Sequence, residues 1–218
     1  PVNRASPGNT VLFNIRPLSC LCAGAYTLLS AVDGGVGGAA YSLGFYPTGD
    51  AFAMCYSASA VTLNVTSADP TVYWTGATDT KWNTVNGTYQ GLNWSTDAAG
   101  TLLAAATPGP NTTVIFNSTA GTGGNPTDTT LEAPFAINDL VFNSTSGSVS
   151  GVTIAAGAAG TLTIAPALST AGIDVQTGSA TAVAIPAPLA LGANQTWTGT
   201  DSGSTLTASG GVSGAASL

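Results

Sequence analysis

The stretch that decides the fold reads Val152-Thr153-Ile154, Leu162-Thr163-Ile164, Ile173-Asp174-Val175, Val183-Ala184-Ile185, Leu189-Ala190-Leu191 and Leu206-Thr207-Ala208, with short linkers between these segments. Each segment alternates apolar residues with a small or polar residue. A period of two places the apolar side chains on one face of a β-strand. Gly, Ser, Ala or Pro separates most of the segments, as turns between short strands require. The stretch therefore predicts all-β structure.

The segments also repeat over a longer distance. Two matching pairs are 21 positions apart in the sequence, Val152 with Ile173 and Leu162 with Val183. Two more are 23 positions apart, Val183 with Leu206 and Leu189 with Val212. A repeat of about twenty residues with two or three strands is what one coil of a parallel β-solenoid needs. We therefore expect a parallel β-solenoid (β-helix) over about residues 110–218, with an antiparallel sandwich as the alternative.

The N-terminal part of the chain predicts a separate small antiparallel, sandwich-like β region over residues 1–68. Its expected strands are 11–15, 26–29, 41–43, 52–54 and 61–65, and the links contain turn sequences such as Pro47-Thr48-Gly49. The sequence Ser67-Ala68-Asp69-Pro70 is the expected boundary. Residues 69–110 then form a Trp-rich cap, and residues 111–218 form the solenoid segment.

Three of the four tryptophans, Trp74, Trp82 and Trp94, fall within the predicted cap. A solenoid has open ends, and an exposed strand edge pairs readily with other chains. The favoured interpretation is that these tryptophans plug the first coil. The alternative is an exposed aromatic platform that stacks on glycans.

Other residues are expected at open strand edges. At the C-terminal side these are Leu206, Val212 and Leu218, where the ladder stops without a capping sequence. At the N-terminal side, the strand with Val11, Phe13 and Ile15 is expected to add to the sheet edge of a neighbour. The sequence thus predicts copies of the chain, or neighbouring tandem modules, as partners.

Composition excludes several classes of function. The chain has three Lys and Arg residues, no histidine and a net charge of −7, so it has no cationic patch for nucleic acid or an anionic membrane surface. It has no apolar run long enough for a transmembrane helix. Only 6% of residues are charged. Copies therefore repel one another little.

Catalytic chemistry has few candidates. A serine triad needs histidine, which is missing. The acidic residues are scattered through turn-like contexts, and only Asp128 and Glu132 are expected to approach Asp139, in a solvated loop. We therefore predict no enzyme activity, no cofactor and no metal site, although a calcium ion held by loop oxygens stays an alternative.

The three cysteines allow one disulfide. Cys20 and Cys22 lie two positions apart, on one face of the same strand, and are poorly placed to bond each other. In one interpretation, one of these two cysteines forms a disulfide with Cys55 on a neighbouring strand, and we take Cys22 as that residue. In the other, all three are small buried hydrophobic residues.

Several motifs resemble those of a known family. They are Tyr73-Trp74-Thr75-Gly76, Lys81-Trp82-Asn83-Thr84, Leu92-Asn93-Trp94-Ser95, the stretch 189–198 and the closing stretch 211–218. They resemble modules of the autotransporter-associated β-strand repeat proteins, which are large secreted or surface-attached bacterial proteins. Residues 26–66 resemble the end of a preceding module. The resemblance implies a β-helix passenger and transfers no catalytic residue.

Together these features predict a non-enzymatic structural module of an extracellular fibre, filament or surface adhesin. It is expected to be secreted, or displayed at the cell surface, and to self-associate through open β edges. The alternative is a carbohydrate-binding adhesive module that uses exposed aromatic residues on surface glycans. The start at Pro1 leads us to expect that a leader was removed or lies upstream.

Overall fold

The computed structural model describes residues 10–15, 24–32, 35–36, 39–44, 50–67, 70–85, 91–117, 127–143, 151–167, 171–200 and 202–218. The chain divides into two compact units, residues 1–67 and residues 68–218. Apart from a 3₁₀ turn at Val32, the regular elements in the described residues are β-strands, which confirms the all-β prediction.

The first unit contains two small sheets. Strands β1 (Thr10–Phe13) and β3 (Ala40–Leu43) pair in parallel, and β2 (Gly24–Ser30), β5 (Ala60–Ser67) and β4 (Asp50–Tyr56) form an antiparallel sheet in that order. Phe52, Leu63 and Val65 form its buried core, against which Ile15 and Leu43 pack. The parallel β1–β3 pair corrects the expectation of antiparallel pairing throughout, because alternation along a strand does not encode the direction of its neighbour.

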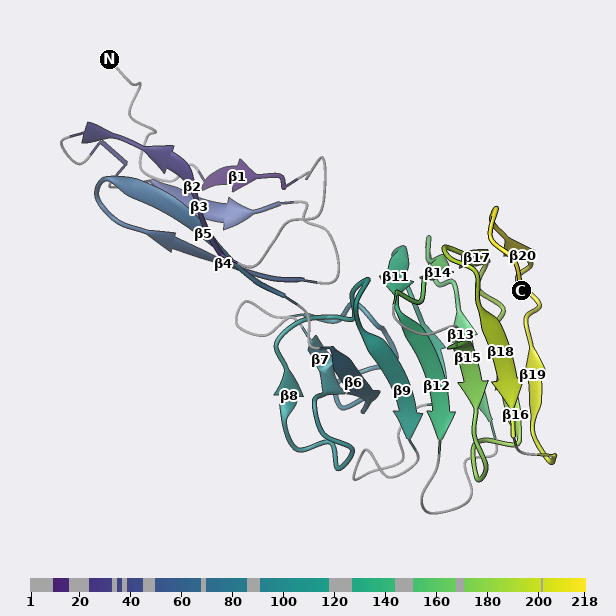
Figure 1. Ribbon diagram of the computed structural model, residues 1–218. Coiled ribbons are helices and arrows are strands. Elements are labelled where there is room, and N and C mark those ends of the chain that lie inside the picture. Colours follow the sequence, from purple (N-terminus) through teal and green to yellow (C-terminus); the bar gives the residue numbers. More distant parts are fainter. Residues whose placement is uncertain are drawn as a thin grey trace. The chain divides into compact units, whose positions relative to one another are not determined.

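The second unit is a β-solenoid with three walls. Wall 1 has the order β18-β15-β12-β9-β6-β7-β8, wall 2 has β10-β13-β16-β19 and wall 3 has β11-β14-β17-β20. The strands of wall 1 are β6 (Thr71–Trp74), β7 (Gly91–Ser95), β8 (Leu103–Ala104), β9 (Thr113–Asn117), β12 (Asp139–Asn143), β15 (Ala171–Val175) and β18 (Thr196–Gly199). Figure 1 shows β9, β12, β15 and β18 side by side along this wall.

Walls 2 and 3 consist of shorter strands. Those of wall 2 are β10 (Asp128–Thr130), β13 (Val152–Ala155), β16 (Ala182–Ala184) and β19 (Thr205–Thr207). Those of wall 3 are β11 (Phe135–Ile137), β14 (Leu162–Ile164), β17 (Leu189–Leu191) and β20 (Val212–Ser213). Each coil therefore contributes one strand to each wall, and successive coils pair in parallel, which confirms the predicted β-solenoid.

The register corrects half of the predicted pairings. Val183 pairs with Leu206, and Leu189 pairs with Val212, as the 23-residue spacing indicates. Val152 pairs with Val183 rather than with Ile173, and Leu162 pairs with Leu189 rather than with Val183. Ile173 belongs to wall 1, between Leu140 and Trp197. Coils of unequal length explain the difference, since the core fixes the strands while the loops vary.

Inward-facing apolar residues stack from coil to coil. Leu140 pairs with Ile173 in wall 1 and both are fully buried, as is Leu162 in wall 3. The rings of Phe116 and Phe142 stack at 5.4 Å. Burying one such side chain contributes about 1.5–3 kcal/mol, so the columns are the main source of stability. Outward positions such as Thr153 and Thr163 stay partly exposed, which completes the alternation seen in the sequence.

Candidate functional site: a closed end and an open end

The two ends of the solenoid differ. At one end, wall 1 continues past the first parallel strand, β6, into β7 and β8, each antiparallel to the strand before it. Under these strands lie the side chains of Trp74, Trp82 and Trp94, with exposed fractions of 2%, 0% and 0%. The Trp-rich segment thus shares wall 1 with the solenoid and closes its first coil.

The tryptophans pack against one another edge to face. The ring of Trp94 lies 4.9 Å from Trp74 and 5.0 Å from Trp82, at interplanar angles of 72° and 84°. The indole N–H of Trp82 donates to Thr129 Oγ1 at 3.0 Å, and that of Trp94 donates to the Trp82 carbonyl oxygen at 3.0 Å. Because a glycan needs an exposed ring face, the alternative use of these three residues as a stacking platform is wrong.

A polar network holds the loop between β6 and β7. Asn93 is fully buried, and its Nδ2 donates to Asp79 Oδ1 and to the Lys81 carbonyl oxygen, each at 2.7 Å. Its Oδ1 accepts from the backbone N–H groups of Thr78 and Asp79 at 2.8 and 3.2 Å. Thr84 donates its hydroxyl to Asp79 as well. All four hydrogen-bonding positions of the buried amide are therefore satisfied.

A second carboxylate organises the turn between β7 and β8. Asp97 accepts hydrogen bonds from the Ser95 hydroxyl, from the backbone N–H groups of Thr101 and Leu102 and from the Thr101 hydroxyl. These bonds need the ionised form, so they hold the pKa of Asp97 well below its usual range. Partial burial raises the pKa of Asp79, but hydrogen bonds from Thr84, Lys81 and Asn93 outweigh it and lower the pKa.

We predict that the closed end loses stability in acid. An aspartate whose pKa is lower in the folded state than in the unfolded chain stabilises the folded state. This contribution is fully present above the pKa of about 3.9 that the aspartate has in the unfolded chain, and it falls as the pH drops below that value. Asp79→Asn with Asp97→Asn should therefore lower the urea midpoint at pH 7 and change it much less near pH 2. Tryptophan fluorescence during urea unfolding measures both midpoints, and an equal difference at the two pH values would contradict the prediction.

The other end of the solenoid is open. Strands β18, β19 and β20 each pair with the previous coil on one side, and no second strand partner is present in the part of the chain that the structure describes. The backbone N–H groups of Thr200 and Thr205 donate to the previous coil. Since alternate residues of a parallel strand bond to opposite sides, the peptide groups of Gly199 and Leu206 point away from it.

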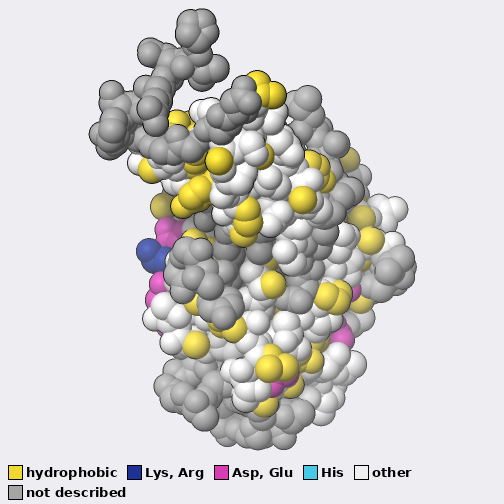
Figure 2. All heavy atoms as spheres, turned by 90° about the vertical axis from the view of Figure 1, so that its left-hand side faces the viewer, with side chains coloured by type: hydrophobic (Ala, Val, Ile, Leu, Met, Phe, Trp, Pro, Cys, Tyr) yellow, Lys and Arg dark blue, Asp and Glu magenta, His cyan; other side chains and the backbone are white. Residues whose placement is uncertain are grey.

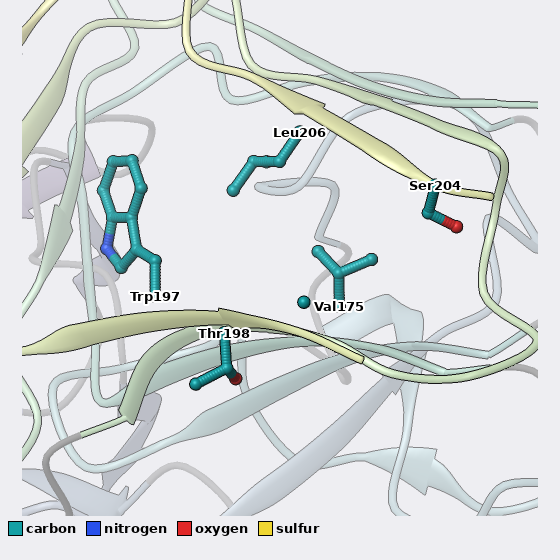
Figure 3. Close-up of a pocket in the computed structure, with 6 residues that line it drawn as sticks. Val175, Trp197, Thr198, Ser204 and Leu206 are labelled. Atoms are coloured by element: carbon teal, nitrogen blue, oxygen red, sulfur yellow. The ribbon is translucent and has the colours of Figure 1, made fainter. Parts of the chain in front are cut away.

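A hollow of about 150 Å³ lies between the open strands β18 and β19 and is lined by Val175, Trp197, Thr198, Gly199, Ser204 and Leu206. In Figure 3, Trp197 and Leu206 point toward each other across this space, and Val175 points into it. A carbon added at Gly199 would meet no atom within 4 Å. The core of the solenoid is therefore accessible at this end, through a hollow lined by both apolar and polar side chains.

Gln195 fixes the position of the Trp197 ring. The amide of Gln195 is buried, its Nε2 donates to the Ile164 carbonyl oxygen at 3.0 Å, and its Oε1 accepts from Trp197 Nε1 at 3.1 Å. Gly172 makes room for this amide, because a Cβ there would lie 1.8 Å from Oε1. Trp197 is thus a preorganised apolar surface at the open end.

The predicted edge residues have different surroundings. Val212 and Leu218 are 44% and 64% exposed, whereas Leu206 is partly buried and faces the hollow. In the first unit, Val11 is exposed, while Phe13 packs against Tyr41 at 6.1 Å and Ile15 packs on the core. The use of either edge in association stays a prediction.

The remaining candidates form no site. Cys55 is exposed on β4, and Asn64 donates to its Sγ at 3.3 Å; Cys20 and Cys22 lie outside the described residues, so the predicted Cys22–Cys55 disulfide is untested. Across the described ranges, no three His, Cys, Asp or Glu side chains gather closely enough to hold a metal ion. Nor do those ranges contain a helix of the length and hydropathy that crossing a bilayer requires.

The surface itself is poor in charge. Figure 2 shows one face of the molecule, where few of the coloured side chains are charged and the hydrophobic ones are scattered. The segment 196–218, which contains all three open strands, has a single charged side chain, Asp201. The open end therefore repels another uncharged surface only weakly.

Sequence reasoning missed Trp197, Gln195 and Gly199 as parts of this end. The available signal was Trp197 itself, the one tryptophan outside the cap and directly before the last two strands of the ladder. A comparison of this chain with protein-family models, with curated proteins and with solved structures finds no match to any of them.

Proposed function

We propose that this chain is a non-enzymatic structural module of an extracellular fibre or surface adhesin that assembles through the open end of its β-solenoid. The observation that supports this most directly is the difference between the ends. One is closed by three buried tryptophans, while the other exposes three strand edges and a hollow that contains Trp197 and Leu206. The partner is another copy of the chain or a neighbouring tandem module.

Physical chemistry favours strand addition at this end. An incoming strand pairs with the outward peptide groups of Gly199 and Leu206, and it covers the apolar surfaces of Trp197 and Val212. The same parallel pairing already joins every pair of coils in the solenoid. Association thus repeats a contact that the fold uses internally, and it needs no new kind of interface.

The extracellular location rests on the sequence. The motifs in residues 72–94, 189–198 and 211–218 resemble those of secreted or surface-attached autotransporter-associated β-strand repeat proteins. Low charge and an uncharged Thr, Ser, Asn and Gly surface suit a fibre in which many copies lie close together. The chain has no histidine and its acidic residues are scattered along the sequence, which supports a mechanical role as the proposal.

Gly199→Asp tests this proposal. A Cβ added at position 199 would lie in open space, so the isolated copy tolerates the aspartate. An assembled copy would instead bury its carboxylate against Trp197. We expect sedimentation velocity to show concentration-dependent oligomers for the wild type and for the control Gly199→Ala. The aspartate variant should stay near the monomer mass of 21.3 kDa. Monomeric wild type at all concentrations, or unchanged assembly of the variant, would contradict the proposal.

A further inference from the structure

We propose that the open end of one copy docks onto the closed end of the next, with β18 pairing alongside β8. This inference rests on the proposed function and specifies which surface of the second copy is used. Wall 1 is one seven-stranded sheet, and its two edge strands are β18 and β8. The partner surface thus lies on the same sheet, at the opposite end of the solenoid.

Strand direction supports this pairing. Strands β6 and β7 are antiparallel, and β7 and β8 are antiparallel, so β8 runs in the same direction as β6. Strand β6 is parallel to β9, and the parallel series continues through β12 and β15 to β18. A β18–β8 contact between two copies in line is therefore parallel, like the contacts between successive coils, and wall 1 continues from copy to copy.

The closed end also carries exposed apolar side chains at this edge. Leu102 and Leu103 are 61% and 42% exposed, directly before Ala104, which is fully buried in the core. Asp97 is the charged residue nearest in sequence to these leucines, and its carboxylate accepts hydrogen bonds from Thr101 and Leu102 within its own turn. An uncharged edge with two exposed leucines matches the nearly uncharged open end, whose hollow contains the apolar side chains of Trp197 and Leu206.

The two surfaces are different, so the contact is heterologous. A heterologous contact leaves one open end and one closed end free after each addition, and it produces a ring or a continuing filament. An isologous contact between two open ends would instead stop at a dimer. The geometry therefore distinguishes growth of a fibre from simple dimerisation.

The test mixes two variants of this 218-residue chain, each blocked at one end. Gly199→Asp blocks the open end, and Leu102→Asp with Leu103→Asp blocks the closed end at exposed positions. Leu102→Asp alone serves as the milder second variant, and tryptophan fluorescence confirms that each protein is folded. We expect either blocked protein to sediment as a monomer and an equimolar mixture to form a 1:1 dimer that grows no further.

Three results would overturn this inference while leaving the proposed function in place. If the leucine variants assemble like the wild type, the closed end is not the docking surface. If the leucine variants alone stop at dimers, two open ends meet each other. A mixture that stays monomeric also rules out the pairing. Unchanged assembly of Gly199→Asp would instead remove the proposed function itself.

Discussion

Replacing Trp82 by alanine is expected to lower the free energy of unfolding of the solenoid by about 3–5 kcal/mol, the usual cost of truncating a buried aromatic residue. Trp82 is fully buried between Trp94 at 5.0 Å and Phe135 at 5.4 Å. The truncation also leaves Thr129 Oγ1 without the indole N–H that donates to it. Urea unfolding measures the loss, because the other three tryptophans, in the same unit, still report the transition.

Trp197→Ala is the matched control for this experiment. Its side chain is only partly buried at the open end, so its truncation removes less buried area and leaves no enclosed cavity. We expect a clearly smaller loss of unfolding free energy than for Trp82→Ala. Equal losses for the two variants, or a loss below about 1 kcal/mol for Trp82→Ala, would show that the closed end does not depend on the tryptophan cluster.

Asn93→Ala is expected to cost about 2–4 kcal/mol, because it removes a fully buried amide whose four hydrogen bonds hold partly buried groups of the loop in place. The Lys81 carbonyl oxygen and the Thr78 N–H lose hydrogen bonds of 2.7 and 2.8 Å. Asp79 loses the Nδ2–H that donates to its carboxylate. The urea midpoint at pH 7 measures the effect.

Asn194→Ala provides the comparison for this second prediction. Asn194 is exposed, and its Oδ1 accepts from the Ser217 N–H at 3.0 Å near the open end. Water can replace that contact, so a change within about 0.5 kcal/mol is expected. If both asparagine variants unfold at the wild-type midpoint, the buried network does not hold the closed end together.

Much of the solenoid could be predicted from alternation alone. Segments such as Val152-Thr153-Ile154 place two apolar residues inward, and the structure uses them as strands of the predicted kind. The register was harder to predict, because 23 positions separate Val183 from Leu206 but 31 separate it from Val152. Inward columns fix which strands stack, whereas corner loops accept insertions at little cost.

The ends could be predicted less completely. Three tryptophans close together in the sequence predicted a plug of the first coil. Their burial agrees with a plug and disagrees with an exposed platform for glycans. The role of Trp197 depends on Gln195 and on the space left by Gly172, which lies one coil away and 23 positions from Gln195 in sequence. Such a contact depends on the register between coils. For the same reason, the strand direction that aligns β8 with β18 is visible only once the sheet order is known.

Fibre diffraction from concentrated, aligned protein tests the central claim most directly. If copies stack end to end through the open end, the strands lie across the fibre and their spacing of about 4.8 Å gives a reflection along the fibre axis. The account predicts this meridional reflection for the wild type and its loss for Gly199→Asp. A strand reflection perpendicular to the axis, or fibres that form equally well from the variant, would contradict it.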